Sequence, residues 1–167
     1  MKLYVLRHGP AEDQAASLKD GDRALTAAGR ERVRAVAKLL VDIGEAPLFI
    51  ATSPLVRAVQ TAEIVAIVCH LTDRSGHLEV RREMEPGGDV AALAWKFASV
   101  GSKRVMLVGH EPDLTVAVRS LLGTFDRVFD KAMVVGLHLP SVGRETRLRF
   151  ILDPRAPRLD PDARRRG

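Results

Sequence analysis

The stretch LYVLRHG at residues 3–9 is an apolar run that stops abruptly at Arg7, His8 and Gly9. A short run of β-forming residues is typical of a buried strand. In open α/β sheets, ligand sites form outside the carboxyl ends of the strands. We therefore expect Arg7 and His8 to stand at such a site, where Gly9 lets the chain turn sharply and leaves room for a ligand. Taken alone, so short a motif is equally compatible with an exposed dipeptide after an edge strand.

The chain beyond residue 9 alternates helix-like and strand-like segments. Apolar residues at helical spacing predict helices over residues 26–43, 53–68, 89–97 and 112–121. The expected N-caps are Thr26, Ser53 and Asp89. Apolar or alternating runs predict further strands over residues 48–52, 77–82, 105–108, 133–139 and 147–152. This pattern predicts an α/β fold, a three-layer α/β/α sandwich whose mostly parallel sheet has about six strands.

The composition is that of one globular domain, with 167 residues, 46% of them hydrophobic and 28% charged. We expect the domain to span residues 1–152, and residues 153–167, rich in Pro, Arg and Asp, to form a loosely ordered basic tail. No apolar run is long enough to cross a bilayer, and no secretory signal is recognisable, so we expect no membrane contact. Cys69 is the single cysteine, which excludes an internal disulfide and favours a cytoplasmic location.

The formal net charge of +5 invites a nucleic-acid interpretation. The arginines, however, are spread over several segments, and only 4% of the residues are aromatic and able to stack on bases. We therefore expect no nucleic-acid partner, because anionic small substrates explain the charge equally well. A non-catalytic module that binds nucleic acid or an acidic protein remains an alternative.

Two predicted strand ends deliver histidine, at His8 and His110, and two arginines, Arg7 and Arg57, fall near the same edge of the sheet. Guanidinium groups donate a planar fork of charge-assisted hydrogen bonds, so this set suits a dianionic phosphoryl group. The sequence has no glycine-rich phosphate loop with its lysine and no carboxylate cluster beside the histidines, so we expect no metal and no cofactor. Without a metal, a histidine can act as the nucleophile, and spacing does not choose between the two.

Three ordered motifs carry a resemblance to a known family. The segments LRHG at 6–9, SPLVRAVQTA at 53–62 and VGH at 108–110 resemble the motifs of the histidine phosphatase superfamily, which has a phosphoglycerate-mutase-like fold. The match runs from residue 2 to about residue 152. The segments RALT at 23–26 and PGGD at 86–89, together with Glu111-Pro112, look most like the SixA-type phosphohistidine phosphatases.

The resemblance implies a role for each residue of the predicted site. It makes His8 the nucleophile that becomes phosphorylated. It makes Arg7, Arg57 and His110 the groups that hold the phosphoryl oxygens and stabilise the transition state. Arg23 is similar in position to a further arginine of the SixA pocket, in the long polar connection over residues 10–25.

Two positions are predicted with less direct support from the motifs. Gly9 is expected beside the bound substrate. Glu83 sits where the mutase branch keeps its proton donor, and Glu85, two residues on, could substitute. The alternative for Glu83 is a solvated loop carboxylate.

The sequence therefore predicts a metal-independent phosphatase that acts through a phosphohistidine intermediate, with phosphohistidine on a signalling or phosphotransfer protein as the substrate. A small-molecule phosphomonoesterase on the same site is the alternative within the enzyme class. We expect a monomer or a weak dimer. The spacing of Cys69, His70 and His77 fits no zinc pattern.

Overall fold

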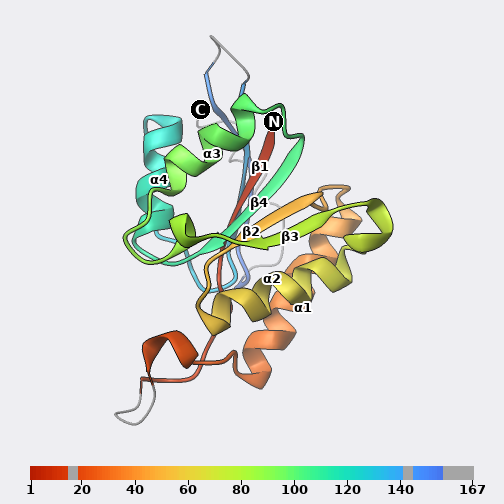
Figure 1. The fold of residues 1–167 in the computed structure, drawn as a ribbon, viewed down its shortest axis with the longest axis vertical. Coiled ribbons are helices and arrows are strands. Elements are labelled where there is room, and N and C mark those ends of the chain that lie inside the picture. The colour runs from red at the N-terminus through yellow and green to blue at the C-terminus, as the bar shows by residue number, and fades with distance from the viewer. Residues whose placement is uncertain (15–18, 141–144, 156–167) are drawn as a thin grey trace.

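The computed structural model describes residues 1–14, 19–140 and 145–155, and it contains one six-stranded sheet (Figure 1). The strands are β1 (Lys2–Arg7), β2 (Phe49–Thr52), β3 (His77–Val80), β4 (Arg104–Gly109), β5 (Val134–His138) and β6 (Arg147–Leu152). Their order across the sheet is β3-β2-β4-β1-β5-β6. The first four strands in this order pair in parallel, whereas β5 is antiparallel to β1 and β6 to β5. The predicted mostly parallel sheet is confirmed.

Two helices cover each face of this sheet (Figure 1). The helices are α1 (Ala27–Asp42), α2 (Val56–Val68), α3 (Val90–Ser99) and α4 (Asp113–Leu122), and the short 3-10 helices are η1 (Asp20–Asp22), η2 (Thr72–Arg74) and η3 (Arg82–Met84). Side chains alternate along β1, so Leu3 and Val5 pack with α3 and α4, while Tyr4 and Leu6 pack with α1 and α2. The three-layer sandwich is therefore confirmed.

The helix caps agree with the sequence in two of three cases. The Thr26 hydroxyl accepts a hydrogen bond from the Gly29 amide, and the Asp89 carboxylate accepts one from the Ala92 amide. The prediction of Ser53 as the cap of α2 is wrong, because α2 begins at Val56. The Ser53 amide still donates to the carbonyl of Val108 in β4. The chain therefore leaves the sheet only after Ser53, and the helix starts three residues later.

The remaining differences from the predictions concern the ends of elements. The strand expected over residues 77–82 ends at Val80, which is 52% exposed on the edge strand β3. Residues 156–167, most of the predicted tail, and residues 141–144, between β5 and β6, lie outside the described residues. Loose attachment of that tail stays a prediction. No helix in the described part of the chain has the length and apolar character needed to cross a membrane.

Candidate active site

The carboxyl ends of three neighbouring parallel strands bring the two histidines together. Pairing of Arg7 with Gly109, and of Thr52 with Val108, makes β1, β4 and β2 end side by side. The residue after β1 is His8 and the residue after β4 is His110, and their ring centroids lie 5.1 Å apart. The sheet register thus confirms that these strand ends share one edge.

The contacts of His8 define which ring nitrogen can react. Its Nδ1 lies 2.7 Å from the carbonyl oxygen of Gly9. Because a carbonyl only accepts, Nδ1 carries the hydrogen and the lone pair of the neutral ring is on Nε2. Burial lowers the pKa of His8 to about 3, and the charges of His110, Arg57 and Arg7 lower it further, against the Gly9 hydrogen bond, which raises it. At neutral pH, His8 therefore has an unprotonated Nε2, the form that a nucleophile needs.

The second histidine is oriented by Ser53. The Nε2 atom of His110 lies 2.8 Å from Ser53 Oγ, which also accepts a hydrogen bond of 3.3 Å from the Leu55 amide. Burial lowers the pKa of His110 to about 4, and the charge of Arg57 adds to this, so the ring is neutral at neutral pH. His110 Nδ1 has no partner among the described residues. In the tautomer in which the Ser53 hydroxyl donates to Nε2, the ring hydrogen lies on Nδ1 and is offered to an acceptor.

Two arginines, Arg57 buried and Arg7 half-buried, place cations beside the histidines. Arg57, only 4% exposed, lies in the first turn of α2, and Arg7 ends β1 with its Nη1 donating 2.6 Å to the carbonyl of Phe129. Burial lowers the pKa of Arg7, against the charge of Glu111, which raises it.

Three buried nitrogens of this site have no hydrogen-bond partner in the described part of the chain: Arg7 Nε, Arg57 Nε and His110 Nδ1. Buried donors are almost always paired in proteins, and unpaired ones cost free energy. A cluster of unpaired N–H donors therefore fits a site built for an oxyanion. Within the described residues, no group of histidine, cysteine, aspartate and glutamate side chains gathers closely enough to hold a metal ion.

The motif at residues 53–62 also holds in place the segment that carries His8. The Thr61 hydroxyl accepts from the Gly9 amide at 3.1 Å and donates to the carbonyl of Arg57 at 2.7 Å. Next to it, the Gln60 side-chain oxygen accepts from the Leu25 amide. These contacts tie α2 to the segment after β1, so one short motif sets both Arg57 and His8.

Gly9 is required for a reason that differs from the predicted one. Its φ is not positive, so the turn after β1 does not depend on a left-handed conformation at Gly9. A Cβ atom there would lie 2.7 Å from Val33 Cγ2, and the space is needed for the packing of α1. Both backbone groups of Gly9 bind within the protein, the amide to Thr61 and the carbonyl to His8. Contact of Gly9 with substrate stays a prediction.

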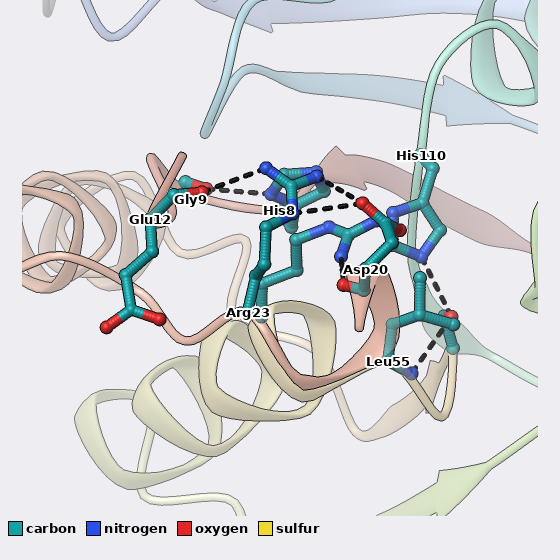
Figure 2. A network of polar contacts seen from close by, with 9 residues as sticks. His8, Gly9, Glu12, Asp20, Arg23, Leu55 and His110 are labelled. Atoms are coloured by element: carbon teal, nitrogen blue, oxygen red, sulfur yellow. Dashed lines mark hydrogen bonds and ion pairs between the residues drawn. The ribbon is translucent and has the colours of Figure 1, made fainter. Parts of the chain in front are cut away.

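The predicted residue Arg23 lies in a cluster with Asp20, which sequence reasoning missed. Arg23 donates to Asp20 Oδ1 from Nε at 2.9 Å and from Nη2 at 2.6 Å, and Arg57 donates to Asp20 Oδ2 at 2.9 Å. Figure 2 shows Asp20 between Arg23 and His110. Hydrogen bonds from Arg57, opposed in part by burial, lower the pKa of Asp20. Arg23 thus shares a carboxylate with Arg57 at the rim of the site.

Glu83 and Glu85 lie in and directly after η3, the short helix between β3 and α3. Glu83 is half-buried within η3, and the Met84 side chain beside it packs on Gly109, the last residue of β4. Glu85 is half-buried directly after η3. The predicted role of either carboxylate as a proton donor stays a prediction.

Comparison with known proteins agrees with this geometry. Residues 3–84 match the family described as the histidine phosphatase superfamily (branch 1). An uncharacterized protein of Picosynechococcus sp. is 42% identical over 117 residues, which cover 68% of each chain. The structure of the protein histidine phosphatase SixA complexed with tungstate is 27% identical, with a TM-score of 0.82 over 92% of this chain and 97% of that one.

Two further solved structures share the fold. The putative phosphohistidine phosphatase SixA from Agrobacterium tumefaciens is 24% identical, with a TM-score of 0.77 over 92% of this chain and 97% of that one. A mycobacterial glucosyl-3-phosphoglycerate phosphatase is 19% identical, with a TM-score of 0.64 over 88% of this chain and 96% of that one.

The fold and the cationic site define a phosphatase with an α/β architecture. The chain belongs to the histidine phosphatase superfamily, branch 1, in its SixA-type branch. The resemblance carried by the three motifs at residues 6–9, 53–62 and 108–110 is therefore confirmed.

Proposed function

We propose that this phosphatase removes the phosphoryl group from phosphohistidine on a signalling or phosphotransfer protein, through a phosphorylated His8 and without a metal. The observation that carries the proposal is the neutral Nε2 of His8 next to buried, unpaired N–H donors on Arg7, Arg57 and His110. A nucleophile and donors for the equatorial oxygens are the parts that metal-free phosphoryl transfer requires.

The first step transfers the phosphoryl group to His8. The Nε2 lone pair of His8 forms a P–N bond while the bond from phosphorus to the substrate nitrogen breaks, and the departing imidazole takes a proton from solvent. Arg7 Nε, Arg57 Nε and His110 Nδ1 donate to the phosphoryl oxygens as negative charge spreads over them. The Gly9 carbonyl holds the hydrogen on His8 Nδ1 throughout, which keeps Nε2 aimed as the reactive atom.

The second step is hydrolysis of the phosphorylated His8. A water molecule attacks phosphorus, the P–N bond breaks, and its electron pair returns to Nε2. The products are orthophosphate and the starting neutral imidazole, so no oxidant, reductant or metal is consumed. The same three donors stabilise the second transition state, because it carries the same distribution of charge.

Two observations favour phosphohistidine over a phosphate ester as the substrate. The imidazole of phosphohistidine leaves far more easily than an alkoxide, so a strongly held proton donor is not needed. Glu83, half-buried in η3, makes no hydrogen bond to the histidines or arginines of the site among the described residues. The likeness to SixA is also closer than the likeness to the glucosyl-3-phosphoglycerate phosphatase, at TM-scores of 0.82 and 0.64.

A phosphomonoesterase for small molecules is the second candidate, because that mycobacterial neighbour of the same fold is described as a glucosyl-3-phosphoglycerate phosphatase. We further propose a cytoplasmic location, supported by a single, buried cysteine, and a monomer or weak dimer that meets its partner protein through the exposed edge of this site.

The proposal is tested with a substrate panel. Turnover of a phosphohistidine-bearing protein, p-nitrophenyl phosphate and a sugar phosphate is measured for the wild type, for His8→Ala and for His70→Ala, which removes a histidine 71% exposed and remote from the site. We expect the highest kcat/KM for the phosphohistidine protein, loss of all turnover in His8→Ala only, and no effect of a chelator. Equal or faster turnover of the small esters would contradict the phosphohistidine assignment.

A further inference from the structure

Asp20 is the one carboxylate in direct contact with the arginines of the site, among the described residues. Its Oδ2 accepts from Arg57 Nη2 at 2.9 Å, its backbone carbonyl accepts from Arg57 Nη1 at 2.6 Å, and its Oδ1 accepts from Arg23. The other nearby carboxylates bind elsewhere: Glu111 holds the amide and hydroxyl of Thr115, and Asp113 accepts from the Gly87 amide.

Asp20 also lies further out than the groups that would hold the phosphoryl oxygens. Its side chain is 48% exposed, whereas His8 and His110 are 6% and 4% exposed. It takes the two terminal nitrogens of Arg57 and leaves the buried Nε unpaired. A phosphoryl group on the buried donors is therefore compatible with Asp20 in place. Figure 2 shows the Asp20 side chain close to those of Arg23 and His110.

We infer that Asp20 is a specificity-determining residue, whose carboxylate occupies the place on Arg23 and Arg57 that a second anionic group of a substrate would otherwise use. The inference rests on the proposed function and names its substrate class: phosphoryl compounds whose leaving group carries no negative charge, such as the imidazole of a phosphohistidine. Phosphate compounds with a carboxylate or a second phosphate near the scissile bond are disfavoured.

The balance of charge supports this assignment. Asp20 is hydrogen-bonded to Arg23 and Arg57, so its carboxylate offsets one of the two positive charges that these guanidinium groups present to a substrate. Without Asp20 the same arginines would match a substrate with one more negative charge. A like charge placed against Asp20 is unfavourable, and such repulsion sets specificity more than affinity. Asp20 also acts electrostatically on His110, so its field reaches the reacting groups.

The test compares phenyl phosphate with 3-carboxyphenyl phosphate, which differ by one carboxylate on the leaving group. The preference, as a ratio of kcat/KM values, is measured for the wild type, for Asp20→Asn and for Asp22→Asn, which removes the same charge from an exposed residue of the same turn η1. We expect the preference for phenyl phosphate to fall about tenfold in Asp20→Asn and to stay unchanged in Asp22→Asn. A preference in Asp20→Asn within twofold of the wild type, or an equal fall in Asp22→Asn, would overturn the inference.

A binding measurement separates this inference from the proposed function. The affinities for inorganic phosphate and for 3-phosphonopropionate, which adds a carboxylate, are determined by calorimetry in the same proteins, with circular dichroism as the check on folding. We expect Asp20→Asn to gain affinity for 3-phosphonopropionate relative to phosphate, about tenfold over the wild type. A wild type without turnover refutes the proposed function alone, whereas an unchanged affinity ratio refutes the role of Asp20 alone.

Discussion

The two ends of the sheet both bury charged groups, but they treat them in opposite ways. At the amino ends of the strands, Glu45 accepts hydrogen bonds from Lys2, Tyr4 and Arg149, with both carboxylate oxygens paired. At the carboxyl ends, buried nitrogens of the histidine and arginine site have no partner among the described residues. Strand β1 connects the two, since Lys2 and Tyr4 lie in its first half and His8 follows its end.

The pKa values separate the two ends in the same way. Burial by itself would raise the pKa of Glu45, but hydrogen bonds from Arg149, Tyr4 and Lys2 outweigh burial and lower it to about 2. For His8, burial dominates and lowers the pKa to about 3, so the ring is kept uncharged among cations. A cluster that satisfies all its own groups stabilises the fold, whereas a cluster that leaves donors unpaired is built to receive a ligand.

The largest effect that this comparison predicts is on activity at the carboxyl end. Arg57→Ala removes a buried hydrogen-bond donor and a positive charge that stabilise the phosphoryl oxygens in the transition state. We expect kcat/KM to fall by about 10² to 10³-fold. Arg149→Ala serves as the matched control, because it removes an arginine from the Glu45 cluster at the other end. Comparable losses of kcat/KM in the two variants would show that the two ends are not distinct.

The next effect is on stability at the amino end. Glu45→Gln removes the charge that pairs with Lys2 and Arg149, and we expect the free energy of unfolding in urea to fall by about 2–3 kcal/mol with kcat/KM unchanged. Because the pKa of Glu45 is lowered from 4.5 to about 2, its stabilisation is complete above about pH 4.5 and is lost as the pH falls toward 2. A difference between wild type and variant that stays constant from pH 6 to 3 would contradict this account.

A smaller effect is expected from the residue that orients His110. Ser53→Ala removes the hydroxyl that fixes the ring hydrogen on His110 Nδ1, and we expect kcat/KM to fall about tenfold. Nitrogen-15 NMR of the ring reports the tautomer directly and should show a mixture in the variant. Ser99→Ala, at an exposed helix end, is the control. An unchanged tautomer with reduced activity would assign Ser53 a different role.

The smallest effect tests a single hydroxyl of the Glu45 cluster, which also accepts a hydrogen bond of 3.4 Å from Arg104 Nε. Tyr4→Phe removes the hydroxyl that donates 2.8 Å to Glu45, and we expect a loss of about 1 kcal/mol in the free energy of unfolding. Urea unfolding measures it, and activity should not change. A loss of activity in Tyr4→Phe without loss of stability would mean that the two ends are coupled through β1.

Local patterns were sufficient to predict the four helices and six strands, apart from the start of α2 and the end of β3. The apolar stripe of α1, with Val33, Val36 and Leu40 buried, repeats at the helical period, and so it can be read from neighbours in sequence. The positions of His8 and His110 could also be predicted. Each follows an apolar run typical of a strand, and the carboxyl ends of neighbouring parallel strands lie at the same edge of the sheet.

What local patterns could not supply are contacts between distant residues. Glu45 is paired with residues of β1 and β6 that lie 43 and 104 positions away, and nothing in its own neighbourhood marks it. Ser53 is followed by Pro54 and an apolar run, a pattern that predicts a helix cap. Its hydroxyl instead contacts His110, a residue 57 positions away in the sequence. Asp20 lies in a loop without periodicity, and its place on Arg57 depends on how η1 packs against α2.

The most direct measurement of the central claim is the identity of the phosphorylated residue. The wild-type protein is mixed with a phosphohistidine-bearing protein, quenched in alkali within a turnover, and mapped by mass spectrometry. The account predicts a phosphoryl group on His8 that is stable in alkali and labile in acid, and none in His8→Ala. Phosphate on another residue, or steady turnover by His8→Ala, would contradict it.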